Sequence, residues 1–354
     1  MSASVDTRAA PRPRGAYVAL AAAALFGASA PLSKALLGSM PPQLLAGLLY
    51  AGSGLGLFVI RSVQRPDEAP LTRNDAPWLA GAVSFGGVIA PVLLMLGLVR
   101  TPASGASLLL NLEGVFTALL AWTIFRENVD RRIAAGMVAI AAGGTLLAWQ
   151  GHASWGGLLG PAAIAAACLA WGLDNNLTQR VSGGDPVQVA MIKGLVAGSV
   201  NTAVAIALGA RVPAFGPTAA ALLVGFLSYG ISLVLFVLAL RHLGTARTGA
   251  YFSTAPFVGA VLSLVVYRER PTTALLIAAV LMGVGVWLHL TEHHEHEHHH
   301  ESMHHEHAHV HDEHHQHEHD ETAPLGEPHS HPHRHERMVH SHHHYPDIHH
   351  RHAH

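Results

Sequence analysis

Long apolar stretches alternate with short polar or Pro/Gly-rich breaks along the first 290 residues. A helix needs about 20 apolar residues to cross the hydrocarbon core of a bilayer. Segments of about ten residues with alternating polarity, which a membrane barrel would require, do not occur among these stretches. Because helices then remain as the way to satisfy the backbone in lipid, the pattern predicts an all-α, polytopic membrane protein. We place ten transmembrane helices at roughly 15–37, 43–60, 77–99, 103–125, 131–149, 157–178, 187–208, 218–240, 246–267 and 272–290.

Composition divides the chain at Leu290. Half of all residues are hydrophobic and 12% are charged, but these values average two unlike parts. The first 290 residues contain 18 Lys and Arg against 10 Asp and Glu, whereas the last 64 contain 3 against 13 and carry 27 of the 30 histidines. A tail with so little apolar content cannot bury a core, so we expect it to be disordered without metal.

The arginines of the short loops predict the orientation, because positive residues are retained on the cytoplasmic side. With the N-terminus inside, the outer loops receive four arginines and the inner segments twelve. An even number of helices then returns the tail to the cytoplasm. We therefore expect a multi-pass protein of the inner (cytoplasmic) membrane with both termini cytoplasmic and lipid around its body.

The body contains an internal repeat. Residues 98–127 align without a gap to 240–269, an offset of 142, and both segments end in an aromatic residue followed by Arg-Glu. A unit of five helices is odd, so two copies must lie in the membrane with opposite orientation, as in many transporters. The expected organisation is a cytoplasmic N-terminal segment, two five-helix repeats and a His-rich cytoplasmic tail, at 1–14, 15–150, 151–290 and 291–354.

The repeat segments also resemble a known family. The residues concerned are 112–116 (LEGVF) with 125–127 (FRE), and 255–257 (APF) with 267–269 (YRE). Over residues 15–290 they are similar to the EamA-type permeases of the drug/metabolite transporter superfamily, although Gly114 stands where the family pattern has proline. The resemblance implies a ten-helix exporter of amino acids, metabolites or drugs. Some similar members join such a body to a His-rich terminus and are linked to nickel and cobalt resistance.

Four ionisable residues fall within the predicted helices, where charge is costly and marks candidate sites: Lys34, Glu113, Asp174 and Lys193. Glu113, with Asn111 beside it, lies near the middle of its helix. We expect it to couple transport to an ion or a proton, the alternative being a hydrogen bond between helices. Lys34 either belongs to the transport path or extends to the outer surface.

Asp174 begins a polar run with Asn175 and Asn176, and Lys193 lies at a similar depth on the next helix. One interpretation is a structural ion pair between Asp174 and Lys193, since buried charges are usually paired. The other makes Asp174 and the two asparagines oxygen ligands of a cation at the inner mouth, with Lys193 as a repelling or replacing charge.

The tail carries the most specific chemical signal in the chain. Imidazole binds nickel, cobalt, zinc and copper, and its affinity falls when the ring is protonated. We expect a divalent transition metal to bind the tail, although no cofactor is required for function. The candidate ligands are His293, His294, His296, His298, His299, His300, His304, His305, His307, His309, His311, His314, His315, His317 and His319.

Three functions remain open on this basis. The first is export of a divalent transition metal, nickel or cobalt ahead of zinc, with the tail collecting ions at the inner mouth. The second is export of a small organic metabolite or amino acid, with the tail as a metal-responsive regulator or buffer. The third is a membrane-tethered metal buffer or sensor. No nucleotide-binding loop or His-Glu-x-x-His motif is present, so we expect neither an enzyme nor a nucleic-acid partner, and a proton or solute gradient would drive transport.

Overall fold

The structure, a computed structural model, describes most of the membrane body and parts of the tail. The described ranges are 13–63, 71–124, 131–149, 155–181, 185–290, 294–300, 303–309, 329–335 and 338–344.

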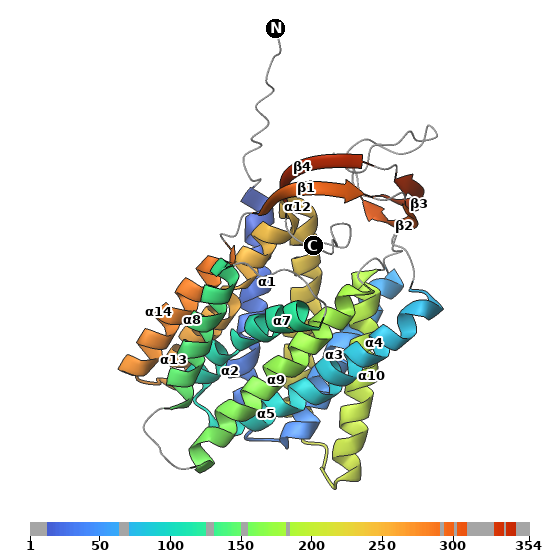
Figure 1. Ribbon diagram of the computed structural model, residues 1–354. Helices are drawn as coiled ribbons and strands as arrows, with labels where there is room; N and C mark the ends of the chain where they lie inside the picture. Colours follow the sequence, from blue (N-terminus) through green and yellow to red (C-terminus); the bar gives the residue numbers. More distant parts are fainter. Residues whose placement is uncertain are drawn as a thin grey trace.

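All the regular secondary structure of the described body consists of helices (Figure 1). In the first half they are α1 (Pro13–Gly27), α2 (Ser29–Leu36), α3 (Pro42–Val63), the 3₁₀ turn η1 (Arg73–Asp75), α4 (Ala76–Ala82), the π-helix η2 (Val83–Ile89), α5 (Ala90–Arg100), α6 (Ala103–Leu109), α7 (Leu112–Thr123) and α8 (Arg131–Ala148). In the second half they are α9 (Trp155–Gln179), α10 (Pro186–Ala207), α11 (Phe215–Gly225), the π-helix η3 (Phe226–Ile231), α12 (Ser232–Phe252), α13 (Ala255–Tyr267) and α14 (Thr273–Leu290).

Eight helical stretches among the described residues are long and apolar enough to cross a membrane, and two shorter apolar helices, Ala255–Tyr267 and Thr273–Leu288, accompany them. A multi-pass helical membrane protein is therefore confirmed, but ten full-length helices are not. The two that fall short are the last two, and for the first of them the reason lies near the predicted pair 218–240 and 246–267. There the helix continues to Phe252, so that only 13 residues remain for α13.

The two halves repeat one another in local structure. The π-helices η2 and η3 end at Ile89 and Ile231, which are 142 residues apart, the offset of the sequence repeat. Elements of one half pack mainly against elements of the other: α3 against α10, α8 against α14, and α6 against α13. In the same way α1 packs against α12, and α9 packs against α5. The pair α8 and α14 forms one edge of the bundle, as Figure 1 shows.

Backbone contact joins α3 to α10. A Cβ on Gly54 would lie 2.6 Å from the carbonyl carbon of Gly194, and one on Gly194 would lie 2.5 Å from the nitrogen of Gly54. Small residues at this crossing let the two backbones approach within van der Waals contact, the usual basis of helix association in lipid.

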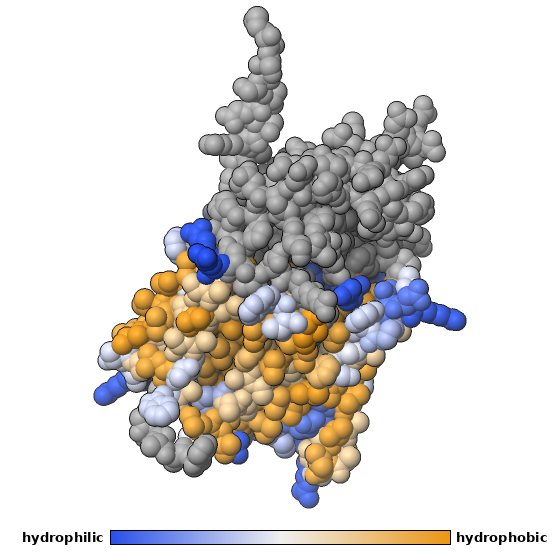
Figure 2. Space-filling model, viewed as in Figure 1, coloured by the Kyte–Doolittle hydropathy of each residue, from blue (hydrophilic) through white to orange (hydrophobic). Residues whose placement is uncertain are grey.

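The outer surface of the body is apolar over most of the face shown in Figure 2, and hydrophilic residues gather towards its two ends. Large apolar side chains such as Val138, Val280 and Trp287 are exposed. In water a contiguous apolar surface of this extent would drive aggregation, so it fits contact with lipid.

The described parts of the tail form four strands: β1 (His294–His300), β2 (Met303–His309), β3 (His329–His335) and β4 (Met338–His344). β1 pairs with β4 and β2 pairs with β3, both antiparallel. The all-α prediction is confirmed for the membrane body, whereas the described tail residues, which we expected to be disordered, form strands. A two-stranded ladder satisfies backbone groups without a buried core, which the composition argument did not consider.

Candidate functional site

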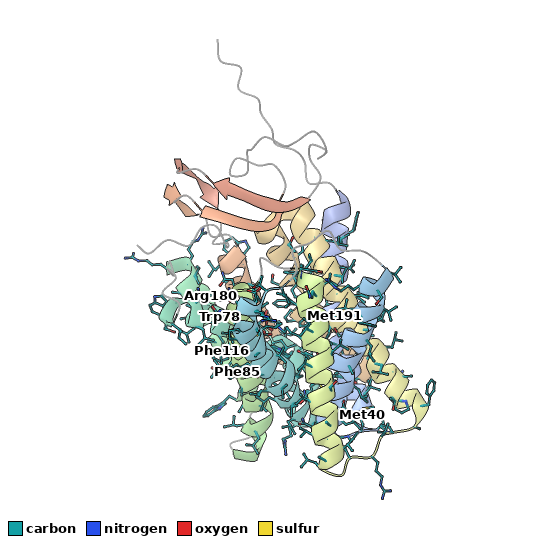
Figure 3. All side chains as sticks on the ribbon, turned by 90° about the vertical axis from the view of Figure 1, so that its right-hand side faces the viewer. Met40, Trp78, Phe85, Phe116, Arg180 and Met191 are labelled. Carbon is teal, nitrogen blue, oxygen red and sulfur yellow. The ribbon has the colours of Figure 1, made fainter. Side chains whose placement is uncertain are left out.

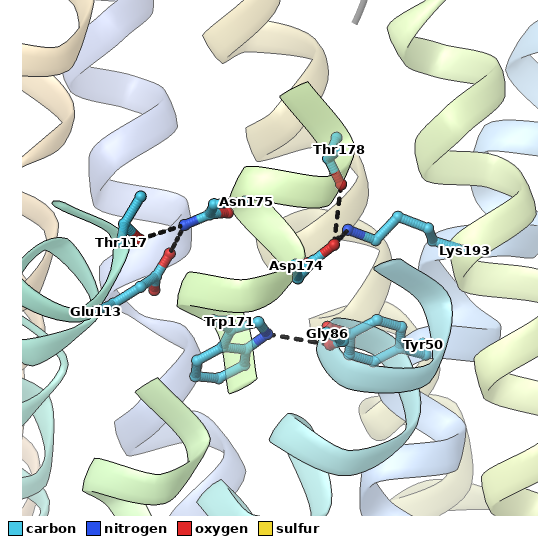
Figure 4. Close-up of polar contacts among 9 residues, drawn as sticks. All are labelled: Tyr50, Gly86, Glu113, Thr117, Trp171, Asp174, Asn175, Thr178 and Lys193. Atoms are coloured by element: carbon cyan, nitrogen blue, oxygen red, sulfur yellow. Dashed lines mark hydrogen bonds and ion pairs between the residues drawn. The ribbon is translucent and has the colours of Figure 1, made fainter. Parts of the chain in front are cut away.

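Backbone carbonyls of the π-helix η2 accept hydrogen bonds from side chains of three neighbouring helices. In its register the N–H of Ala90 bonds to the carbonyl of Phe85, five residues earlier. The next donor in this register is residue 91, a proline without an N–H, so the carbonyl of Gly86 receives no helical hydrogen bond. Two side chains replace it: Tyr50 Oη donates to Gly86 O at 2.7 Å, and Trp171 Nε1 donates to it at 3.0 Å (Figure 4).

Asn201 on α10 serves the same segment. Its Nδ2 donates to the carbonyls of Gly87 and Val88 at 3.1 and 3.3 Å, and the residue is fully buried. Side chains from α3, α9 and α10 thus bind carbonyls of the π-helix η2. Gly86 and Gly87 have no side chains that would keep them away.

Asp174 and Lys193 form a nearly buried ion pair beside this turn. Lys193 Nζ lies 2.6 Å from both carboxylate oxygens of Asp174, and Thr178 Oγ1 donates to Oδ1 at 2.9 Å. The side chains are 17% and 6% exposed. The structure therefore has the pairing that the first sequence interpretation describes, and both oxygens of Asp174 are occupied by it.

Glu113 lies on the other side of α9, near the start of α7, and its partner is an amide. Asn175 Nδ2 donates to Glu113 Oε1 at 2.9 Å and lies 3.1 Å from Thr117 Oγ1 (Figure 4). Asn175 is exposed and Glu113 is partly exposed. Within the described part of the chain no donor contacts the second oxygen, Oε2, and no cation pairs with the carboxylate.

The other two predicted asparagines donate hydrogen bonds to backbone carbonyls. Asn176 Nδ2 donates to the carbonyls of Gly172 and Thr117 at 2.8 and 3.1 Å. Asn111 is buried, and its Nδ2 donates to Leu108 O at 2.9 Å, where α6 ends and α7 has not yet begun. The three predicted oxygen ligands Asp174, Asn175 and Asn176 therefore contact different partners in the structure.

Lys34 lies by a second cluster, around the end of α5 and the start of α6, where Glu269 connects the two halves. Its Nζ donates to Leu98 O at 2.9 Å and also to Thr101 O, which satisfies carbonyls at the end of α5. Glu269 accepts from the backbone N–H groups of Ala103 and Ser104 at 2.9 and 3.1 Å, and from the Ser104 hydroxyl. Lys34 thus binds the protein rather than extending into solvent.

Aromatic side chains from both halves contact one another next to Gly86, to which Tyr50 is bonded. The rings of Tyr50 and Tyr229 are 5.6 Å apart, and Phe26 lies 5.9 Å from Tyr229 and 5.3 Å from Phe252. Figure 3 labels aromatic and methionine side chains of other helices, including Phe116 of α7. The site thus combines one carboxylate without a cationic partner, amide and hydroxyl groups, and flat apolar surfaces.

No group of three or more metal-ligating His, Cys, Asp or Glu side chains occurs within the residues that the structure describes. The predicted tail ligands are not tested by this finding. His293, His311, His314, His315, His317 and His319 lie outside the described residues, and the side chains of the nine predicted histidines on β1 and β2 lie outside the description as well.

Sequence reasoning missed Tyr50, Asn201 and Glu269. The first two are neutral, and the search considered ionisable groups within the predicted helices. A search for every hydrogen-bonding side chain in the middle of an apolar stretch would have found both. The repeated Arg-Glu motif, which Glu269 ends, could have drawn attention to this residue. Its partners on α6 are 165 and 166 residues away in the sequence, so the motif does not predict them.

Comparison with known proteins agrees with this architecture. Two segments of the chain, 13–149 and 158–291, match the EamA-like transporter family. A protein of Methanothermobacter thermautotrophicus described as an uncharacterized transporter is 31% identical over 291 residues, which cover 77% of this chain and 85% of that protein. A solved structure described as "Crystal structure of protein" shares the fold, with a TM-score of 0.59 at 20% identity over 78% of this chain and 97% of that one. Matched twice along its body, the chain belongs to the EamA-like transporter family.

Proposed function

We propose that the protein is a proton-coupled exporter of a small organic solute in the inner membrane. Its two five-helix units face in opposite directions, both termini are cytoplasmic, and the solute and the proton use Glu113 in turn. The observation that carries this proposal is a carboxylate in the middle of a membrane helix, partly exposed, with one amide donor and no cationic partner in the described residues. Such a group gains and loses a proton without breaking an ion pair.

The exposed side of Glu113 and Asn175 faces water rather than lipid in this proposal. A carboxylate and an amide exposed to hydrocarbon would be strongly unfavourable, and intramembrane ionisable groups face the bundle interior or a water-filled cavity. Gly114, next to Glu113, also has open space around it: a Cβ there would contact nothing within 4 Å. These residues therefore line the solute path.

Organic solute is preferred to metal for the membrane region. A bound transition metal needs several ligands around one point. Asp174 is occupied by Lys193, Asn176 donates to backbone carbonyls, and the stacked aromatic rings offer no ligand atoms that such ions favour. Aromatic walls with a few placed polar groups are typical of sites for small organic molecules. In this proposal the tail binds nickel, cobalt, zinc or copper as a regulator or buffer.

Export of nickel or cobalt is the second candidate, and the 27 histidines of the tail favour it. A tail that holds metal at the inner mouth would raise the local ion concentration there. The ion would then pass the membrane region in hydrated form, with Glu113 and Asn175 as the polar contacts.

Purified full-length protein in proteoliposomes with an internal pH dye tests the proposal. We would add amines, amino acids, sugars, organic phosphates and the four metal chlorides in turn and record proton movement. Glu113→Gln keeps an acceptor for Asn175 but removes the titratable group, whereas Asp75→Asn removes a loop carboxylate that caps η1. We expect an organic solute to drive proton exchange in the wild type and in Asp75→Asn, and not in Glu113→Gln. Solute exchange that does not respond to an imposed pH gradient would contradict the proposal. So would exchange that only nickel or cobalt elicits and that is lost when residues 291–354 are deleted.

A further inference from the structure

We infer that the corner between α5 and α6, at Thr101-Pro102, is the outer gate of the transporter. Lys34 and Glu269 hold this gate shut, and it opens when both release the corner while α12 breaks at Gly244, the equivalent position in the second repeat. The inference rests on the proposed function and on the predicted orientation, in which this corner faces outside, and it adds the gate.

Charged side chains from two different parts of the chain bind the backbone of the corner. Thr101 is extended, with φ −119° and ψ 138°, so α5 ends before it and α6 begins after Pro102. Proline has no N–H to donate to Leu98 O, four residues earlier, and Lys34 Nζ donates to this carbonyl instead, at 2.9 Å. Glu269 accepts from two backbone N–H groups in the first turn of α6, at 2.9 and 3.1 Å.

The helix after the corner is enclosed by protein. All seven residues of α6 are buried, whereas Val115 is the one buried residue of α7. Gly259 of α13 packs on α6, since a Cβ there would lie 2.9 Å from Ser107 Oγ. Tyr267, at the end of α13, donates to the carbonyl of Pro31 in α2 at 2.6 Å. The helices α2, α6 and α13 are therefore joined at the end of the molecule where the corner lies.

The equivalent corner of the second repeat has a different conformation. The repeat offset of 142 relates Thr101-Pro102 to Leu243-Gly244. These two residues lie inside α12, which runs without a break from Ser232 to Phe252. The π-helices η2 and η3, which precede the two corners, occupy equivalent positions. The two repeats therefore match up to the corners and differ there.

A difference of this kind is required if the solute path is open to one side only. Two inverted units in the same conformation would be related by a twofold axis in the membrane plane, so both sides of the membrane would meet the same surface. A path that is closed outside and open inside needs the units in two conformations. Exchange of these conformations between the units would close the path inside and open it outside.

The sequence of α12 is suited to a break at Gly244. Four weak helix formers fall within six residues there: Gly244, Thr245, Thr248 and Gly249. Glycine is also accepted at the residue that precedes a helix, the place that Pro102 has before α6. A helix that restarts after Gly244 would be the counterpart of α6.

The backbone next to Glu269 is strained in the closed form. Arg268 has φ 50° and ψ 35°, and within the described part of the chain it is the single non-glycine residue with a positive φ. This left-handed conformation is unfavourable for arginine and persists where contacts hold it. The hydrogen bonds of Glu269 to α6 do so, and their release would let the end of α13 relax.

Cysteine labelling of full-length protein tests the gate without a known solute. Ser107, buried in α6 against α13, becomes the reporter as Ser107→Cys in a Cys168→Ser background. With the gate intact, a membrane-impermeant methanethiosulfonate should label it slowly in intact cells. Glu269→Ala or Lys34→Met should raise this rate at least about tenfold, because loss of a hydrogen bond to a charged group shifts a two-state equilibrium by that factor or more.

Variants of α12 test the link between the two corners. Gly244→Pro breaks α12 at the second corner and leaves the first unchanged, and it should also raise the outside labelling of Ser107→Cys. Gly244→Ala favours the continuous helix and should lower both outside labelling and solute exchange. Gly249→Ala adds the same methyl group to the same helix and is the control, with both readouts unchanged. Mere loosening of the outer end would not respond to changes at Gly244.

The outcomes separate the inference from the proposed function. Labelling of Ser107→Cys that is as fast with Lys34 and Glu269 present as without them, or that does not respond to the Gly244 variants, would overturn the inference while solute exchange stands. Faster labelling in inverted membrane vesicles than in cells would overturn it too, because the corner would then face inside. Labelling after denaturation and chromatography in detergent show that each variant is present and folded; if Glu269→Ala does not fold, Lys34→Met and the Gly244 variants still decide. If no solute moves protons in proteoliposomes, the proposed function falls whatever the labelling shows.

Discussion

Glu113 and Asp174 are two carboxylates on neighbouring helices, and their partners give them different roles. Asp174 contacts an ammonium and a hydroxyl, and Glu113 contacts one amide. Changing protonation at Asp174 would break an ion pair, whereas Glu113 titrates without that cost. We therefore assign stability to the first residue and solute exchange to the second.

The ion pair provides a test at the residue scale. Lys193→Met leaves Asp174 buried without a cation, and we expect a loss of roughly 3–5 kcal/mol of stability, as for other broken buried pairs. The double variant Asp174→Asn with Lys193→Met removes both charges and should recover most of it. Thermal unfolding in detergent measures the recovery, and solute exchange by the double variant should persist. A double variant that melts as low as the single one, or a stable one that has lost exchange, would count against a structural role.

At this scale the sequence predicted the charged residues but not their partners. Charge inside an apolar stretch identified Lys34, Glu113, Asp174 and Lys193 because of its cost in lipid. Nothing in the sequence shows that Asn176 bonds to carbonyls while its neighbour Asn175 reaches Glu113, since adjacent residues on a helix point in directions about 100° apart. That choice depends on where α7 packs.

Among the elements, interruptions within the helices were the hardest features to predict. The apolar pattern is the same in a π-turn as in an α-helix, so η2 and η3 left no signal in hydropathy. Pro91 gives a reason for the free carbonyl of Gly86, but only the structure shows Tyr50 and Trp171 occupying it. The break between α6 and α7 lies at Leu110-Asn111, before Glu113, rather than at Gly114, where the family pattern has proline.

The short helix α6 depends on a cap from the other half of the chain. Glu269 accepts from two N–H groups in its first turn, where a negative charge also favours the helix dipole. Glu269→Ala should lower stability by about 0.5–2 kcal/mol, the usual cost of a lost cap, and Glu269→Gln by less because its amide oxygen still accepts. Melting curves in detergent would measure both, with Arg270→Ala as an exposed neighbouring control. Equal effects of Ala and Gln, or none, would show that the contact does not stabilise α6.

For the whole molecule, the sequence predicted the division at Leu290 and the repeat, because both depend on composition and pattern rather than on contacts. The family model matches two segments of the chain, 13–149 and 158–291. The pairing of the tail strands was not predicted, because β1 and β4 pair residues as far apart in the sequence as His294 and His344. Long-range pairing of this kind leaves no periodic signal between the segments.

Opposite orientation of the two units makes a prediction for the whole molecule. Asn74 and Gly216 are 142 residues apart, at equivalent positions in the repeats, and both are exposed. A cysteine fits at Gly216, where a Cβ would contact nothing within 4 Å. In a Cys168→Ser background, which removes the chain's single cysteine, intact cells should label Gly216→Cys with a membrane-impermeant maleimide and leave Asn74→Cys unlabelled.

Permeabilised cells should label both variants, which controls for reactivity, and Ser39→Cys, at an exposed turn on the predicted outer side, should behave like Gly216→Cys. The two positions are equivalent in the repeat. They are therefore labelled from opposite sides of the membrane only if the two units have opposite orientations. Labelling of Asn74→Cys and Gly216→Cys from the same side would mean that the units are parallel. A single exchange site open to each side in turn would then lose its structural basis.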